Sequence, residues 1–208
     1  MKNIISIKNV SKKFNDKIVL KDINLEIPKQ KIIGLTGKNG SGKTVLLKII
    51  AGLYFPSEGT VTIDSSLELK NDFGFLIDTG FLEEETGFNN LKLLAGLKNQ
   101  INDKEIHEIM QYANLNSYNK TKYKNYSTGM KEKLKIAQAI MEKPKVLILD
   151  EPFNGLDETS VTHFRQIFLK MKEEGVTIIL TSHYKEDINE LCDEVYNMKN
   201  GELIYETR

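Results

Sequence analysis

The eight residues 37–44 have the types and the spacing of a phosphate-binding loop. They read GKNGSGKT and match the pattern G-x-x-x-x-G-K-[ST]. Glycines in such a loop let backbone N–H groups turn toward an anion, and a helix that begins beside them directs the positive end of its dipole to the same point. We expect the whole loop to contact phosphate: Gly37, Lys38, Asn39, Gly40, Ser41, Gly42, Lys43 and Thr44.

Two side chains of this loop have the chemistry that nucleotide hydrolysis needs. The Lys43 ammonium would reach the β- and γ-phosphates of a bound nucleotide, and the Thr44 hydroxyl would bind Mg²⁺. The alternative is a chance glycine-rich turn before a helix with an exposed lysine. A predicted strand before the loop and a predicted helix after it favour the phosphate site.

The flanking residues predict the elements that hold the loop. Residues 31–36, KIIGLT, form a short β-branched apolar run that is typical of a buried strand. After the loop, five apolar residues recur at helical spacing: Leu46, Leu47, Ile49, Ile50 and Leu53. We therefore expect the loop to join a buried strand to an amphipathic helix.

A pair of carboxylates forms the second candidate site. Asp150 and Glu151 follow residues 146–149, VLIL, an apolar run without alternation that is expected for a strand covered on both faces. Ligands bind at the carboxyl ends of such strands. We expect Asp150 to hold Mg²⁺, directly or through water, and Glu151 to polarise an attacking water. Acidic pairs at strand ends are also common on surfaces, so this prediction depends on the phosphate loop.

Ser127 and Gly129 form the third candidate site. They lie in YSTGM, directly before a helix predicted at residues 131–142. A helix N-terminus can bind an anion, but serine is also a favoured N-cap residue. On these residues alone, the N-cap is the better interpretation.

The rest of the chain alternates between strand and helix patterns, which indicates an α/β protein. Leucines and isoleucines at helical spacing predict a mostly helical insertion over residues 80–142. A helix is also predicted at residues 158–174. Further strands are expected at residues 4–10, 18–27, 60–63, 73–77, 177–181, 194–198 and 202–206.

Composition sets limits on the partners of the protein. Twenty-nine Lys and Arg balance twenty-nine Asp and Glu in 208 residues, so no net charge attracts nucleic acid. The single cysteine, Cys192, excludes an internal disulfide and fits a reducing compartment. No uncharged apolar run of eighteen residues occurs, and the N-terminus lacks a secretory apolar region. We expect a cytoplasmic protein.

Some residues keep two interpretations at this stage. Phe14 is a core or hairpin aromatic on local evidence. Residues 116–126, NSYNKTKYKNY, interleave lysine and tyrosine, which can bind nucleic acid, although a solvated surface loop is the better interpretation. His107 and His163 belong to no motif, and we expect both at the surface.

The motifs GKNGSGKT, YSTGM, VLILDEP, NGLD and TSH, in this order, resemble the nucleotide-binding subunit of an ATP-binding cassette (ABC) transporter. The resemblance covers essentially the full chain. It implies the P-loop NTPase ABC-ATPase fold, with a mainly parallel core sheet, an N-terminal antiparallel β subdomain and a helical subdomain. It divides one nucleotide-binding domain, residues 1–208, into a RecA-like core at about residues 1–79 and 143–208 and a helical part at about 80–142.

The resemblance also implies roles for single residues. Phe14 matches the aromatic that stacks on adenine, and His183 matches the switch histidine that senses the γ-phosphate. Ser127 and Gly129 match signature positions that contact ATP held by the other subunit, and Asp157 matches an aspartate at the dimer interface. The implied catalytic residues are Glu151, His183 and Lys43, and the implied cofactors are ATP and Mg²⁺.

Three features depart from the family pattern. Asp78 stands where a glutamine usually reaches Mg²⁺, and its carboxylate is shorter and charged. Thr128 and Met130 replace the usual Gly and Gln of the signature, and residues 64–72 form a shorter loop than usual. The sequence around Asp78, FGFLIDTGF followed by GFNNLKLLAGL, is similar to that of the family members that export bacitracin and lantibiotic-type peptides. We keep Asp78 as a candidate metal ligand beside Thr44 and Asp150.

The resemblance predicts an ATPase subunit that powers a separate polytopic membrane permease, for export of cargo such as a peptide antibiotic. In the family, each ATP is held by the phosphate loop of one cassette and the signature of another. Because this chain has one copy of each motif, the resemblance implies two cassettes, in a homodimer or in a heterodimer with a paralogous cassette. The expected location is the inner face of the cell membrane, with no nucleic acid bound. Two alternatives remain: a soluble ABC ATPase that remodels a ribosome or nucleic-acid complex, and a regulatory ATP-binding module without useful hydrolysis.

Overall fold

The computed structural model describes residues 2–78 and 80–206. Its N-terminal part is an antiparallel sheet of three strands in the order β2-β1-β4. β1 (Asn3–Phe14) and β2 (Lys17–Pro28) form the predicted hairpin, and β4 (Glu58–Ile63) pairs with the other edge of β1. The two hairpin strands are longer than the sequence pattern predicted.

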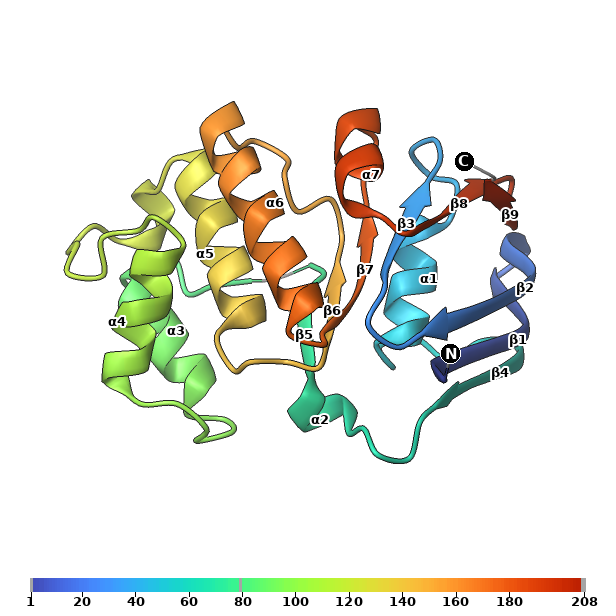
Figure 1. Cartoon of the computed structure of the whole chain (residues 1–208), viewed down its shortest axis with the longest axis horizontal. Coiled ribbons are helices and arrows are strands. Elements are labelled where there is room, and N and C mark those ends of the chain that lie inside the picture. The colour runs from blue at the N-terminus through green and yellow to red at the C-terminus, as the bar shows by residue number, and fades with distance from the viewer. Residues whose placement is uncertain (1, 79, 207–208) are drawn as a thin grey trace.

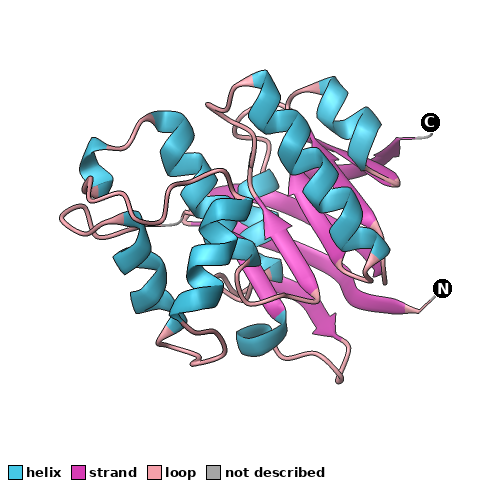
Figure 2. Cartoon of the chain, turned by 60° about the vertical axis from the view of Figure 1, so that its left-hand side comes forward, coloured by secondary structure: helices cyan, strands magenta, loops and turns pink. Residues whose placement is uncertain are grey.

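The second sheet has six strands in the order β5-β6-β7-β3-β8-β9. The first five are parallel to one another, and the final hairpin makes β9 antiparallel to β8. Figures 1 and 2 show this sheet running through the middle of the molecule with helices packed beside it. The strands are β3 (Ile32–Thr36), β5 (Phe73–Leu76), β6 (Val146–Leu149), β7 (Thr177–Thr181), β8 (Glu194–Lys199) and β9 (Glu202–Glu206).

The helices cover both faces of this sheet. α1 (Lys43–Ile50), α6 (Glu158–Glu173) and α7 (Lys185–Leu191) each follow a parallel strand, so they begin at its carboxyl end. α5 (Thr128–Ile140) packs on β5. The remaining helical elements are α2 (Leu69–Asp72), α3 (Gly87–Ala95), α4 (Asp103–Tyr112) and the 3₁₀ turn Tyr123–Asn125.

Two hydrophobic clusters explain the uninterrupted apolar run of β6. Leu147 and Leu149 belong to the cluster that includes α4, α5 and α6. Val146 and Ile148 belong to the cluster that joins α1 to the N-terminal sheet. Because successive residues of a strand point to opposite faces, a strand covered on both faces must be apolar at every position. This burial fixes the point at which Asp150 and Glu151 leave the sheet.

Figure 1 shows α3 and α4 at one end of the molecule and the N-terminal sheet at the other. α4 begins with a capping box in which Asn102 and Glu105 hydrogen-bond each other's backbone N–H groups. Among the helices of residues 2–78 and 80–206, none combines the length and the apolar character that spanning a bilayer requires.

The structure corrects several local predictions. α1 ends at Ile50, and Leu53 is exposed rather than helical, because Gly52 adopts a left-handed conformation that stops the helix. Leu97 lies beyond α3 and is exposed. The polar segments that contain α2 and α7 were not predicted to be helical, since each helix is short and has few apolar residues.

The tyrosine-rich stretch 116–126 is not a wholly solvated loop. Tyr123 and Tyr126 are buried, and the Tyr126 hydroxyl accepts a hydrogen bond from the Gly87 amide at 3.2 Å. His107 is partly buried between the rings of Phe88 and Tyr118, with centroid separations of 4.4 and 4.6 Å. The expectation of plain surface positions was wrong for these residues, because aromatic side chains on polar segments were used for packing.

Candidate functional site

The phosphate loop connects β3 to α1, as the sequence predicted. Gly42 is the N-cap of α1 and has φ +115°, and Gly37 has φ +133°. A Cβ atom at Gly37 would lie 2.3 Å from the carbonyl oxygen of Met198, so no other residue fits there without displacing β8. The tight loop brings backbone N–H groups to the start of a helix, where an anion is favoured.

Lys43 and Ser41 leave polar groups available inside this loop. The buried Lys43 ammonium donates to the Gly37 carbonyl at 2.8 Å, across the loop it belongs to. The buried Ser41 hydroxyl oxygen has no hydrogen-bond partner among the described residues. Buried polar groups are normally paired, so an unpaired hydroxyl in a cationic loop fits an anionic ligand such as a phosphate chain.

Asp150 receives a hydroxyl on each carboxylate oxygen. Thr44 donates to Oδ2 at 2.6 Å, and Thr181 at the end of β7 donates to Oδ1 at 2.6 Å. The three residues therefore come from the ends of neighbouring strands: Asp150 follows β6, Thr181 ends β7, and Thr44 lies at the start of α1, after β3. In the sequence, Thr181 was placed at the end of a predicted strand and in the motif TSH, but no role in the site was predicted for its hydroxyl.

Glu151 faces two basic groups. Its Oε2 atom lies 2.9 Å from Nδ1 of His183, and its Oε1 atom lies 4.0 Å from the Lys43 ammonium. The Glu151 backbone has φ +50°, an uncommon conformation for a residue with a side chain, and its N–H donates to Thr181 at 2.8 Å. The structure thus brings Lys43, Thr44, Asp150, Glu151 and His183 together.

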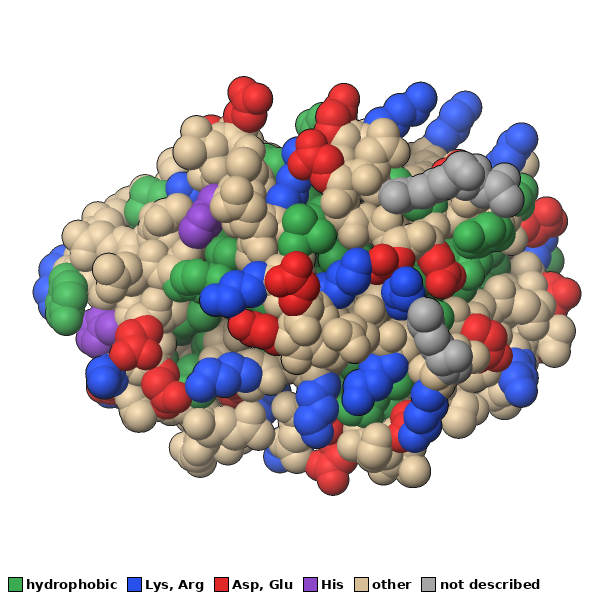
Figure 3. Space-filling model, viewed as in Figure 1, with side chains coloured by type: hydrophobic (Ala, Val, Ile, Leu, Met, Phe, Trp, Pro, Cys, Tyr) green, Lys and Arg blue, Asp and Glu red, His purple; other side chains and the backbone are tan. Residues whose placement is uncertain are grey.

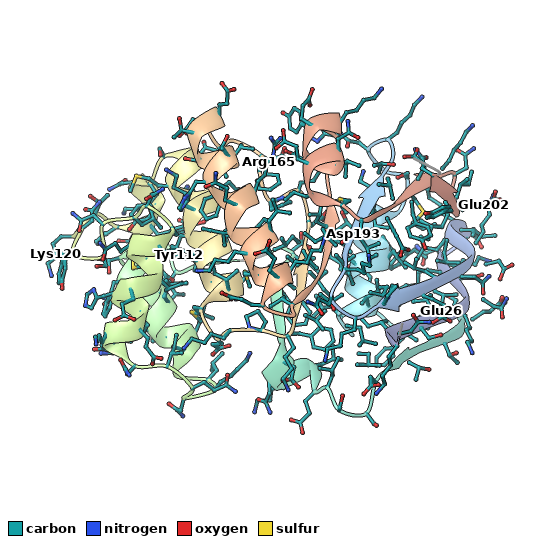
Figure 4. The ribbon with its side chains drawn as sticks, viewed as in Figure 1. Glu26, Tyr112, Lys120, Arg165, Asp193 and Glu202 are labelled. Atoms are coloured by element: carbon teal, nitrogen blue, oxygen red, sulfur yellow. The ribbon has the colours of Figure 1, made fainter. Side chains whose placement is uncertain are left out.

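The loop that carries His183 is anchored to the protein interior. The Ser182 hydroxyl donates to the buried carboxylate of Asp187 at 2.7 Å and accepts from the Tyr184 amide at 3.0 Å. Arg165 on α6 pairs with Asp187 and, at 2.8 Å, with Glu190 on α7 (Figure 4). Sequence reasoning missed this network because its members are far apart in the chain and match no motif.

Asp78 lies beside the site with its carboxylate already paired. It forms a close ion pair with Lys48 on α1, and the hydrogen bond to Asp78 raises the pKa of the Lys48 ammonium. Asp78 has φ +46° at the end of β5 and lines a cavity of about 240 Å³ that Asp150 and Glu151 also line. The geometry places Asp78 near the carboxylates, and its role as a metal ligand stays a prediction.

A larger cavity, of about 1050 Å³, lies on the outer side of the phosphate loop. Its walls are the loop itself, residues 182–185 after β7, the β8–β9 turn and part of β2. Phe14 does not contribute to this wall in the described structure: it packs edge-to-face on Tyr54, with 5.5 Å between ring centroids. Its contact with adenine stays a prediction.

The remaining candidates lie away from the loop. Ser127 is the N-cap of α5, and its hydroxyl accepts from the Met130 amide at 3.2 Å. Asp157 caps α6 by accepting from the Ser160 amide at 2.8 Å. Gly129 approaches the loop after β6, since a Cβ atom added there would lie 3.4 Å from the Gly155 carbonyl. α5 packs on β5, three strands from β3, which is roughly 14 Å at ordinary strand spacing.

Comparison with known proteins identifies the family. A sequence model of the family described as "ABC transporter" matches residues 20–154. This chain belongs to the ABC transporter family. The chain is similar to the bacitracin transport ATP-binding protein BcrA of Enterococcus faecalis, at 36% identity over 99% of this chain and 70% of BcrA. It is also similar to the lantibiotic transport ATP-binding protein SrtF of Streptococcus pyogenes, at 30% identity over 98% of this chain and 90% of SrtF.

The ABC-ATPase fold is likewise confirmed. The dimeric post-hydrolysis structure of the ATP-binding cassette MJ0796 bound to ADP and Pi superposes with a TM-score of 0.88, at 25% identity over 98% of each chain. The family, the α/β fold and the ATPase activity predicted from the sequence are therefore established for this ABC cassette. Relatives named for bacitracin and lantibiotic transport also confirm the branch that the residues around Asp78 indicated.

Proposed function

We propose that this ABC cassette hydrolyses ATP between two copies of itself and thereby drives a separate membrane permease. The observation that carries the first part is the convergence of five groups at one phosphate loop: Lys43, Thr44, Asp150, Glu151 and His183. Lys43 and the loop amides bind the β- and γ-phosphates. Glu151 accepts a proton from the attacking water, and His183 holds that carboxylate in place.

The donor set fits Mg²⁺, which prefers oxygen ligands and few protein side chains. Thr44 and Asp150 supply a hydroxyl and a carboxylate side by side. Among the described residues, no group of three His, Cys, Asp or Glu could hold a metal ion without other ligands. Two protein oxygens with nucleotide phosphates therefore suit this site, and bound Mg²⁺ would neutralise charge on the phosphate oxygens.

We propose two copies because Ser127, the N-cap of α5, and Gly129, in its first turn, lie away from the phosphate loop of their own chain. We propose that the N-terminus of α5 binds the γ-phosphate of ATP held by the second copy. A paralogous cassette could replace one copy by the same geometry. Closure on ATP and reopening after hydrolysis then follow from the different contacts that ATP and its products make.

Exposed leucines support a membrane partner. Leu82, Leu93 and Leu97 expose 58%, 55% and 73% of their surface around α3. We propose that these three side chains form one apolar patch, the kind of surface that marks a protein interface. On the face shown in Figure 3, basic and acidic side chains are interspersed, which does not favour a nucleic-acid partner. We propose that α3 and the segment before it bind the permease at the inner face of the membrane.

Export of a peptide antibiotic is the cargo proposal, and it rests on the names of BcrA and SrtF. Copurification tests the partner: the chain is tagged in its native cell and recovered from membranes in mild detergent. A polytopic membrane protein should copurify with the tagged chain in stoichiometric amount. It should not copurify with the L93D or L97D variant. The control I204D changes a comparably exposed residue on β9 and should retain it. Recovery only from the soluble fraction, with ribosomes or DNA, would contradict the transport proposal.

A further inference from the structure

The Thr181 hydroxyl connects the two carboxylate residues of the site. Thr181 is the last residue of β7 and is fully buried. Its Oγ1 atom donates to Asp150 Oδ1 at 2.6 Å and accepts from the Glu151 amide at 2.8 Å. The directions are fixed, because a carboxylate only accepts, a backbone N–H only donates, and a hydroxyl has one hydrogen with free lone pairs.

For Asp150, the Thr181 bond completes the orientation of the carboxylate. Thr44 holds Oδ2 from the phosphate loop, and Thr181 holds Oδ1 from the neighbouring strand. Thr44 is also the residue that would turn its oxygen to a metal ion. Thr181 is not a candidate metal ligand. Its bond can therefore hold the Asp150 carboxylate in its orientation toward the phosphate loop while the Thr44 hydroxyl turns to the metal ion.

For Glu151, the Thr181 bond fixes the backbone. The φ angle of +50° is unfavourable for a residue with a side chain, and such conformations persist only where neighbouring groups determine them. Thr181 holds the Glu151 N–H, and His183, two residues further on, contacts its carboxylate at 2.9 Å. The last residue of β7 therefore holds the Glu151 backbone, and the loop that follows β7 holds its side chain.

We propose that Thr181 is a positioning residue for ATP hydrolysis, which sets the geometry of Asp150 and Glu151 through one hydroxyl without touching the nucleotide. Its loss leaves the part-buried Glu151 N–H without its acceptor and the Asp150 Oδ1 atom without its donor. Both carboxylates then lose their alignment with the phosphate loop, while the loop itself is unchanged.

Three variants test this role. T181V removes the hydroxyl at nearly constant shape, and T181S retains it. T177V is the matched control: Thr177 is also fully buried on β7, and its hydroxyl accepts from the Gln30 amide at 2.8 Å at the opposite end of the strand. T177V therefore loses a comparable hydrogen bond away from the site.

For T181V we expect turnover to fall on the order of 100-fold, which is typical when catalytic groups are displaced by about an ångström. The affinity for a fluorescent ATP analogue in EDTA should stay within about twofold of the unmodified chain, while the gain in affinity on adding Mg²⁺ should shrink. T181S should recover most of the turnover. T177V should lose thermal stability but keep turnover within about twofold.

Turnover of T181V within twofold of the unmodified chain would overturn the proposal. Equal losses in T181V and T181S would also overturn it, and so would an equal loss in T177V, because the effect would then come from strand stability. If T181V does not stay folded, T181A replaces it. The results expected for T181A, and those that would overturn the proposal, are the same as for T181V.

Discussion

The imidazole of His183 contacts the carboxylate of Glu151, with 2.9 Å between Nδ1 and Oε2, while Oε1 of the same carboxylate faces Lys43 at 4.0 Å. The two oxygens of Glu151 are thus directed toward two basic groups, one within the phosphate loop and one on the loop after β7. Glu151, the proposed base, therefore lies between the phosphate loop and His183, the residue proposed to sense the γ-phosphate.

Replacement of Glu151 by glutamine should separate binding from catalysis. E151Q keeps the shape of the side chain but removes its basicity, so ATP binding should persist and steady-state hydrolysis should fall at least about 100-fold. Phosphate release measures the second quantity. The exposed Glu158 at the start of α6 supplies the control, since E158Q should hydrolyse normally. Undiminished hydrolysis in E151Q would show that Glu151 is not the base.

Replacement of Lys43 by alanine should weaken nucleotide binding. The Lys43 ammonium is buried and donates to the Gly37 carbonyl, so K43A removes the cation of the loop and one bond that closes it. Titration calorimetry should record at least about a tenfold loss of ATP affinity, in line with a lost charge-assisted hydrogen bond. K29A at an exposed position should bind as before. Unchanged affinity in K43A would contradict the assignment.

Asp78 should tolerate glutamine. Its carboxylate is exposed and pairs with the largely buried Lys48, and the amide oxygen of a glutamine can accept a hydrogen bond from the same ammonium. D78Q should therefore keep its melting temperature and hydrolyse ATP within about threefold of the unmodified chain. Complete loss of hydrolysis would show that the carboxylate itself, rather than a side-chain oxygen at that position, is required.

Arg165 should stabilise the His183 loop from a distance. R165A leaves the buried Asp187 carboxylate without its cation, which costs on the order of 3 kcal/mol. Urea unfolding measures this loss. E190Q removes only the exposed partner of Arg165 and should cost less than about 1 kcal/mol. Equal losses in the free energy of unfolding of R165A and E190Q would show that the buried Arg165–Asp187 pair contributes no more than the exposed Arg165–Glu190 pair.

Asp193, which is labelled in Figure 4, should make the free energy of unfolding depend on pH in the acid range. Burial acts to raise the pKa of Asp193, but bonds from the Ile32 amide and Lys172 outweigh it and leave the pKa lowered. A lowered folded pKa gives stability that is complete above the unfolded pKa of about 3.9 and is lost as pH falls through the folded value. D193N should cost about 2 kcal/mol at pH 7, and the difference should shrink below pH 4. A constant difference at both pH values in denaturant unfolding would contradict this.

Particular residues show what could be predicted from sequence. Residues 31–44 and 146–151 each combine an apolar strand with polar residues at its end, so the elements and the placement of the candidate residues at strand ends followed from local pattern. Thr181 lies in the motif TSH, but its bond to Asp150 spans 31 positions of the chain, and the Arg165–Asp187 bond spans 22. Local sequence patterns do not reveal contacts of this kind. Tyr123 and Tyr126 were expected in solvent because their neighbours are polar, but tertiary packing buried them.

The association state of E151Q in ATP tests the central claim most directly. Light scattering should show a mass of 23.7 kDa without nucleotide or with ADP, and twice that mass with ATP and Mg²⁺. G129D places a side chain and a charge at the proposed γ-phosphate contact, so the double variant should bind ATP yet stay a monomer. E151Q that is saturated with ATP but remains at 23.7 kDa would contradict the shared-nucleotide arrangement of two copies.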